Sequence, residues 1–119
     1  MAGGCIKLTN ADFHIIDADI ELVKCVLANS LLHVDCEGGL VHLATQLGTK
    51  CLVLFGPTEE KYYGFKENLN VVSNFCSPCY FAWENGNTCL RGEKEPPCMS
   101  SITPQLVCEV TCTYLKNKA

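Results

Sequence analysis

Residues 31–58, LLHVDCEGGLVHLATQLGTKCLVLFGPT, decide the fold of this chain. They open with a short apolar run, residues 31–34, that is typical of a strand, and residues 35–39 then turn the chain sharply into an amphipathic helix. Gly48 is expected to end that helix, as glycine commonly does just after a helix C-cap. Residues 50–55 form a near-continuous apolar run of the kind found in strands that are covered on both faces. The stretch therefore predicts strand, helix and strand in direct succession.

The residues before this stretch extend the same alternation. Residues 5–8 predict a further strand. Asp17 is expected to cap a helix whose apolar stripe includes Ile20 and Leu27 and which ends near residues 29–30. Alternating strands and helices with short connections are typical of a parallel sheet with right-handed crossovers. The first sixty residues are thus predicted to be α/β and Rossmann-like.

The residues after this stretch complete the prediction. Residues 68–72 offer one more strand, and Thr103 with Pro104 is expected to open a last helix that runs to about Lys116. With 119 residues the chain has room for one domain, residues 1–119, which we expect to be a partial Rossmann-like parallel sheet with a C-terminal helix. Residues 76–98 lack helical or strand periodicity and are expected to form a cysteine-rich loop.

Composition excludes several classes of protein. Apolar residues make up 48% of the chain and charged residues 18%, so it is expected to fold as a globule. The net charge of −4 and the absence of a basic cluster argue against nucleic acid or an anionic membrane as a partner. No apolar run approaches the ~20 residues that span a bilayer. The N-terminal residues, 1–5, lack the charged region and the apolar run of a signal peptide, so we expect a cytoplasmic location.

The turn at residues 35–42 is the first candidate for a binding site. Gly38 and Gly39 would let a ligand approach the backbone, and the amides at a helix N-terminus favour an anion such as a nucleotide diphosphate. In the alternative interpretation, the glycines only make a tight turn and His42 is a half-buried helix residue.

The loop at residues 55–58 is the second candidate. It follows a predicted strand at its carboxyl end, the edge of an open α/β sheet where ligands collect. Thr58 would be placed there to contact a ribose or a phosphate. A simple turn that ends the strand is the alternative.

Four cysteines in the loop form the third candidate, namely Cys76, Cys79, Cys89 and Cys98. Four thiolates in a segment with few large apolar side chains indicate a loop ordered by one tetrahedral metal ion, iron or zinc. We expect Trp83 to pack over that site. Two disulfides are the alternative, disfavoured in a reducing compartment. The remaining cysteines are expected to be reduced core or near-core residues, namely Cys5, Cys25, Cys36, Cys51, Cys108 and Cys112.

Taken in order, these motifs resemble those of the heptosyltransferase family of GT-B glycosyltransferases, glycosyltransferase family nine. The resemblance covers about residues 15–115 and is carried by residues 37–44, 47–49, 54–58, 76–79, 98–99 and 102–104. It is nearest to the autotransporter heptosyltransferase branch, which modifies proteins and carries a cysteine-ligated iron. It implies the donor-binding C-terminal part of an inverting enzyme that takes a sugar, such as heptose, from a nucleotide-sugar such as ADP-heptose to a protein or lipopolysaccharide acceptor.

The resemblance also implies roles for individual residues. Glu37 stands where the family usually has Asp, and Gly39 and His42 match its glycine and histidine. The backbone amides of residues 38–40, the last of them that of Leu40, would bind the donor. Glu37 and His42 would contact the donor through their side chains, and Thr58 would lie near its phosphates. The metal would be structural.

In the family, an N-terminal domain holds the acceptor site and the general base, and a lysine meets the donor phosphate. We find no counterpart of that domain or of that lysine in this sequence. We therefore assign no catalytic residue and expect the chain alone to be inactive. It could be a fragment, one half of a split protein that pairs with a separate N-terminal domain, or a remnant.

The second hypothesis is that the chain is a metal-stabilised interaction module. A partial sheet exposes an unpaired edge and apolar surface, so we expect homo-oligomers.

Overall fold

A computed structural model describes residues 9–76, 78–79 and 89–118 of the chain. Three strands form a parallel sheet in the order β1 (His33–Cys36), β2 (Cys51–Phe55) and β3 (Leu69–Val72). His33 pairs with Cys51, and Leu52 pairs with Leu69. The three central strand predictions and the α/β class are confirmed, with boundaries shifted by one or two residues. The predicted strand at residues 5–8 lies outside the described residues.

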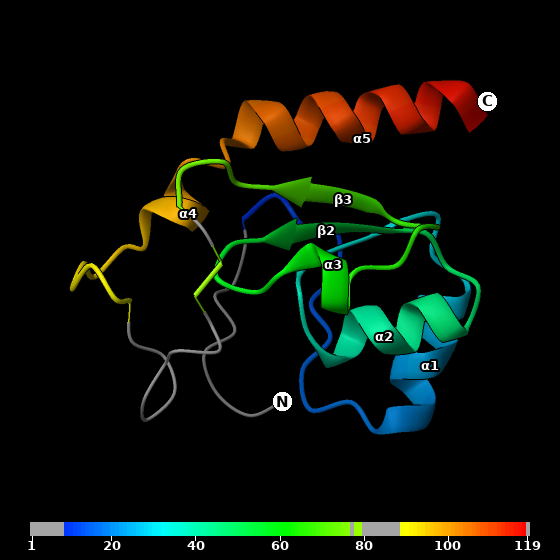
Figure 1. Ribbon diagram of the computed structural model, residues 1–119. Coiled ribbons are helices and arrows are strands. Elements are labelled where there is room, and N and C mark those ends of the chain that lie inside the picture. Colours follow the sequence, from blue (N-terminus) through cyan, green and yellow to red (C-terminus); the bar gives the residue numbers. More distant parts are fainter. Residues whose placement is uncertain (1–8, 77, 80–88, 119) are drawn as a thin grey trace.

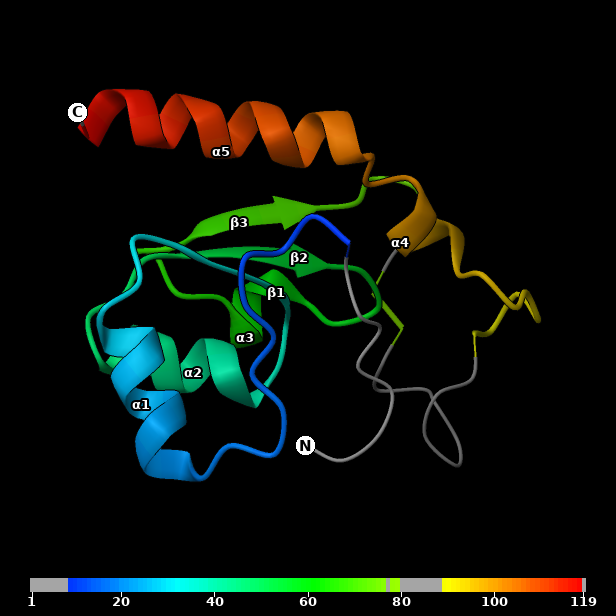
Figure 2. The same ribbon diagram turned by 180° about the vertical axis from the view of Figure 1, so that it is seen from behind.

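Helices α1 (Ile20–Ala28) and α2 (Gly39–Gln46) lie on one side of this sheet, and α5 (Pro104–Lys118) lies on the other (Figures 1 and 2). The predicted cap of α1 is wrong by two residues. Asp19 accepts a hydrogen bond from the amide of Leu22 at 2.9 Å, whereas Asp17 sits in the left-handed backbone region with φ 56°. Aspartate tolerates that conformation better than most residues, so Asp17 turns the chain into the helix.

The core lies between the α1 and α2 pair and the sheet. Its buried side chains come from both helices and from alternate positions of β2, namely Leu27, Val41, Ala44, Cys51, Val53 and Phe55. The buried hydroxyl of Thr49 donates to the carbonyl of Leu27 at 2.7 Å and joins the end of α1 to the start of β2. The main cluster of buried apolar residues therefore lies within residues 20–55.

Gly48 ends α2 as predicted, with φ 85° directly after the C-cap Leu47. A Cβ atom at this position would meet nothing within 4 Å, so glycine is favoured by the backbone angle alone. The chain can then pass from α2 into β2 within four residues.

Helix α5 begins at Pro104, and the hydroxyl of Thr103 accepts a hydrogen bond from the amide of Leu106 at 3.2 Å, which confirms the predicted cap. No described residue of α5 is buried. Two short helices were not predicted: α3 (Glu60–Tyr63) after β2, and α4 (Pro97–Ser100), which contains Cys98. Four residues are too few for an apolar periodicity to be recognised.

Most of the predicted core cysteines are not in the core. Cys51 is buried, but four others are exposed, namely Cys25, Cys36, Cys108 and Cys112, and Cys5 lies outside the described residues. The error follows from judging each cysteine by its element, because burial depends on what covers that element. No disulfide joins any of the nine described cysteines.

Candidate functional site

A cleft of about 530 Å³ opens at the carboxyl end of β1 and β2. It contains three of the predicted binding residues, Glu37, Gly38 and Thr58. Strand ends, the start of α2 and two short helices supply its walls, which consist of Cys36, Glu37, Gly38, Leu54, Gly56, Pro57, Thr58, Tyr63 and Met99. The two turns that the sequence singled out separately thus meet in one cleft, at the sheet edge where parallel α/β folds bind ligands.

The glycines at the start of α2 are not required by the fold. Gly38 has an extended backbone, φ 170° and ψ −174°, which other residues also adopt. A Cβ atom at Gly38 would meet the Cys36 carbonyl oxygen at 3.9 Å, and one at Gly39 would meet nothing within 4 Å. The tight-turn interpretation therefore does not explain these two residues, and their missing side chains leave open space beside the cleft.

Backbone amides face that open space. The helix is not capped by a side-chain hydrogen bond, and the amide of His42 donates to the Gly38 carbonyl oxygen at 3.4 Å as the first turn closes. The amides before it, including those of Gly39 and Leu40, have no partner within the helix. The side chain of Leu40 points elsewhere, because it packs against the core.

Glu37 and His42 form a pair beside the cleft. The His42 Nε2 atom lies 3.1 Å from Glu37 Oε1, and the side chains are 44% and 14% exposed, respectively. The ring of Phe65 meets the imidazole edge to face, with 5.1 Å between centroids. His42 therefore does not line the cleft itself but holds the carboxylate that does.

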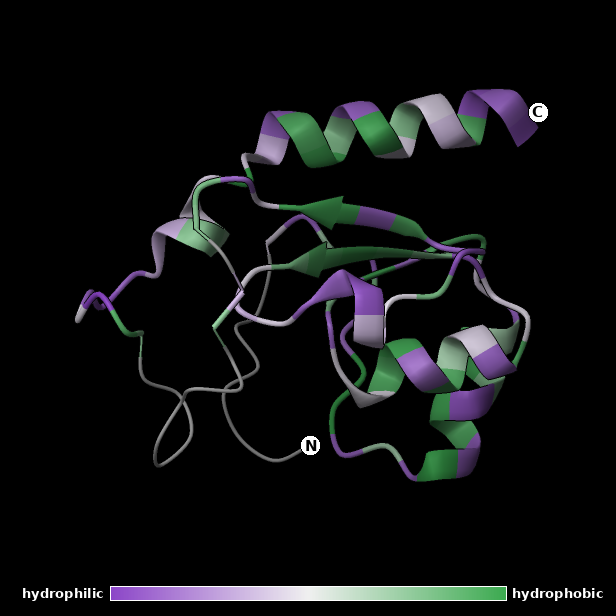
Figure 3. Ribbon diagram, in the orientation of Figure 1, coloured by the Kyte–Doolittle hydropathy of each residue, from purple (hydrophilic) through white to green (hydrophobic). Residues whose placement is uncertain are grey.

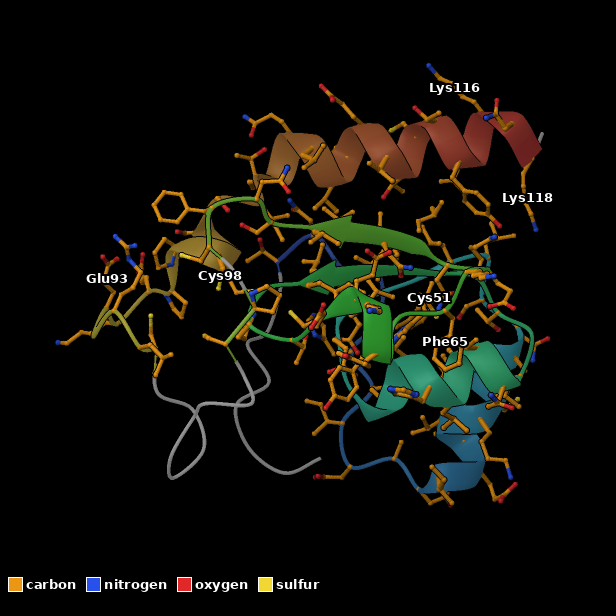
Figure 4. All side chains as sticks on the ribbon, in the orientation of Figure 1. Cys51, Phe65, Glu93, Cys98, Lys116 and Lys118 are labelled. Atoms are coloured by element: carbon orange, nitrogen blue, oxygen red, sulfur yellow. The ribbon has the colours of Figure 1, made fainter. Side chains whose placement is uncertain are left out.

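The end of β2 is in close contact with the cysteine-rich segment. A Cβ atom at Gly56 would lie 2.3 Å from Met99 Sδ and 3.2 Å from Cys98 Sγ, so no larger residue fits without displacing α4 side chains. The amide of Cys79 donates to the Pro57 carbonyl at 2.9 Å. Figure 4 shows Cys98 beyond the carboxyl end of β2, at the opposite end from Cys51. Met99, which directly follows the cysteine-rich segment in α4, thus provides one wall of the cleft.

Of the four candidate metal ligands, three lie near the fourth, Cys98. Cys98 is buried, and Cys76, Cys79 and Cys89 are half-buried. Burial raises the pKa of the Cys98 thiol, and negative charge on Cys76, then on Cys79 and Cys89, raises it further, while a hydrogen bond from the Met99 backbone lowers it. The sulfur atoms are near enough to interact electrostatically. They do not converge, however, because no three His, Cys, Asp or Glu side chains within the described residues are placed to hold a metal ion.

Sequence reasoning missed Tyr63 and Met99 as walls of the cleft. Both belong to four-residue helices, and each reaches the cleft through a contact that local patterns do not encode. The Cys98-Met99 pair in the motif set was the one available signal for Met99. Trp83, expected over the metal, lies outside the described residues.

Comparisons with protein-family models, curated proteins and solved structures give no match for this chain. What the described residues define is a mixed α/β fold with a three-stranded parallel sheet and a cleft at its carboxyl edge. None of their helices combines the length and the apolar character needed to cross a membrane.

Proposed function

We propose that this chain is the donor-binding part of a GT-B glycosyltransferase and that its cleft binds the diphosphate of a nucleotide-sugar such as ADP-heptose. The observation that carries the proposal is the pair of glycines, Gly38 and Gly39, which the fold does not need and which leave the start of α2 open beside the cleft. Amides at the start of a helix, together with the positive end of its dipole, favour a phosphate oxygen at this position.

The neighbouring side chains suit the rest of such a ligand. Thr58 would donate its hydroxyl to a phosphate oxygen, and Glu37 would accept hydrogen bonds from ribose or sugar hydroxyls. A carboxylate beside a diphosphate would be repelled, so it must be directed away from the phosphates. The contact with His42 supports such an orientation of the carboxylate, since Glu37 Oε1 lies 3.1 Å from His42 Nε2.

The cysteine-rich segment supports a structural metal ion as the second part of the proposal. Cys76, Cys79, Cys89 and Cys98 would each supply one thiolate, and the ion, iron or zinc, would act as a cross-link. The four cysteines suit iron or zinc because thiolate sulfur is a soft ligand and three of these cysteines lie near Cys98. Binding of the ion must draw the sulfur atoms closer together than they lie here. The ion would hold Cys98, and with it the neighbouring Met99, against the cleft.

No residue of the chain is assigned a catalytic role. Transfer would need a general base and an acceptor site on a separate N-terminal domain, so the isolated chain is expected to bind donor without turning it over. Donor affinity should be weak, because no lysine among the described residues lines the cleft to meet the phosphates.

Titration of the whole chain with ADP and ADP-heptose, with UDP and GDP as controls, tests the nucleotide part of the proposal. Gly38→Ala is the decisive variant, because its Cβ meets only ordinary contacts in the protein, while Gly38 itself lines the cleft. Thermal unfolding should be unchanged while ADP binding falls at least ~10-fold. Equal or absent binding of all four nucleotides by the wild-type chain would contradict the proposal.

Elemental analysis of chain purified without added metal tests the second part. We expect about one iron or zinc per chain, and Cys89→Ser should lower the content and expose the segment to proteases. Cys25→Ser, an exposed cysteine on α1, is the matched control. Absence of metal together with four reactive thiols would rule this part out.

A metal-stabilised interaction module is the second candidate function. Large apolar side chains before and after α1 are exposed, with Phe13 at 87%, Ile16 at 61% and Leu31 at 73%. Such a surface suits homo-oligomerisation or docking of a separate domain. Association in solution without nucleotide binding would favour this candidate.

A further inference from the structure

Two exposed cysteines on α5 form a second group of thiols, apart from the cysteine-rich segment. Cys108 and Cys112 are both reduced and exposed, although cysteine is among the residues most often buried in folded proteins. Their spacing of four places them on successive turns of one helix face. Leu115 lies on the same face and is 38% exposed, and Figure 3 shows apolar residues in successive turns of α5.

Cys108 and Cys112 lie outside the side of α5 that meets the sheet. The half-buried positions Val107, Val110, Thr111 and Tyr114 mark that side. Glu109 and Thr113 line a groove beside β3, on one flank of that side. With 3.6 residues per turn, Cys108 and Cys112 project from the opposite flank. A ligand or another chain can therefore approach both thiols together.

The two thiols cannot readily bond to each other. Side chains four residues apart on a helix have Cβ atoms ~5–6 Å apart, whereas a disulfide needs about 3.5–4.5 Å. A metal ion relaxes this requirement, because it lies between the sulfur atoms with Zn–S distances of about 2.3 Å. Cys108 and Cys112 are thus arranged to share one ion while α5 stays helical.

Two thiolates are half of the tetrahedral set that a structural zinc ion requires. Within the described part of the chain, no third His, Cys, Asp or Glu joins them in a metal-binding group. We propose that Cys108 and Cys112 are one half of a metal site that a second copy of this chain completes, with a soft divalent ion such as zinc bridging two α5 helices.

A two-fold axis through the ion explains why a second copy suits this site. The axis brings the same face of each α5 together, and in an antiparallel pair Cys108 of one copy lies next to Cys112 of the other. All four ligands then come from one repeated element, and the exposed Leu115 side chains become covered. The four thiols release their protons to solvent when the ion binds. The proposal is independent of the nucleotide cleft, which lies at the strand ends.

Light scattering on the whole reduced chain, with and without zinc, tests the proposal, and elemental analysis after gel filtration gives the zinc content. Wild-type chain should double its mass on zinc addition and return to the initial mass with chelator. The double variant Cys108→Ser/Cys112→Ser should stay at the initial mass and lose one zinc per two chains. Cys25→Ser should behave as wild type.

A second variant separates coordination from simple packing. Cys108→His/Cys112→His keeps two zinc ligands at the same spacing and should restore the zinc-dependent doubling. Doubling that persists in the serine variant, or zinc uptake at these residues without a change in mass, would overturn the proposal. Failure of the histidine variant to respond to zinc would count against it equally.

Discussion

The two faces of the sheet are not covered equally. On the face towards α1 and α2, Cys51, Val53 and Phe55 are at most 1% exposed. On the other face, Leu52 is fully buried and Val71 is 8% exposed, but Val34 is 48% exposed, and no described residue of α5 is buried. The first face is covered by two helices that contribute buried side chains, whereas the second is covered at its centre and open at β1. More of the stability should therefore come from the first face.

The largest expected effect is on the α1 and α2 side. Phe55→Ala removes a fully buried ring at the end of β2 and should lower the free energy of unfolding by about 3–5 kcal/mol. Val110→Ala, a half-buried position on α5, should cost under ~1 kcal/mol. Urea denaturation measures both. Similar losses for the two variants would show that the faces contribute equally.

A smaller loss is expected at the junction of α1 and β2. Thr49→Val keeps the shape of the side chain but removes the hydrogen bond from the buried hydroxyl to the Leu27 carbonyl at 2.7 Å, and that carbonyl keeps the Ser30 amide as a donor at 3.1 Å. Loss of one such hydrogen bond costs about 0.5–1.5 kcal/mol. Thr113→Val on α5 is the control and should be neutral, because that residue is exposed. Equal midpoints in urea for the two variants would argue against a role for the junction.

Alkaline pH should weaken the α1 and α2 side through Cys51. Burial raises the pKa of this thiol, and a nearby Asp35 charge raises it further, although a hydrogen bond with Thr45 lowers it. The unfolded chain therefore loses this proton first, so stability is full below the ordinary thiol pKa and falls as pH rises above it, by at most ~1.4 kcal/mol per pH unit. Cys51→Ala should flatten this part of the stability profile, whereas Cys25→Ala should not. Parallel profiles for wild type and Cys51→Ala would exclude Cys51 as the cause.

The smallest effects are expected at the two helix caps. Asp19→Ala should lower global stability by about 1 kcal/mol, because α1 belongs to the cooperative core. Thr103→Ala removes a comparable cap from α5 but should reduce helicity without moving the urea midpoint, since α5 can fray separately. Circular dichroism followed together with hydrogen exchange of the core amides distinguishes the two. A shifted midpoint for Thr103→Ala would mean that α5 unfolds with the core.

Elements that depend mainly on neighbouring residues could be predicted from local sequence patterns. The apolar run of β2, the periodicity of α2 and the glycine that ends it all depend on neighbouring residues, and each was predicted close to its observed place. The N-cap of α1 was misplaced because two aspartates, Asp17 and Asp19, compete within one turn of chain. Residue identity does not show which of them adopts the left-handed backbone.

The rest depends on contacts between distant segments. Cys108 and Cys112 looked like core residues because cysteine on a helix is usually covered, and the incomplete second layer is a property of the whole fold. Met99 reached the cleft through its contact with Gly56, 43 positions away in sequence. The predicted Glu37, Gly38 and Thr58 did meet in one cleft, because parallel strands end at a common edge.

Gly48 and Gly56 limit, for different reasons, which substitutions this sequence can accept during evolution. At position 48 the surroundings are open and the constraint is the positive φ, so asparagine is the natural replacement and needs no change elsewhere. At position 56 a side chain would clash with the Met99 side chain, which would have to move. A replacement there is therefore best accommodated by a smaller residue at position 99. Related sequences should therefore vary independently at position 48 and jointly at positions 56 and 99. Covariation of positions 56 and 99 would indicate that the contact between α4 and the end of β2 has been kept during evolution.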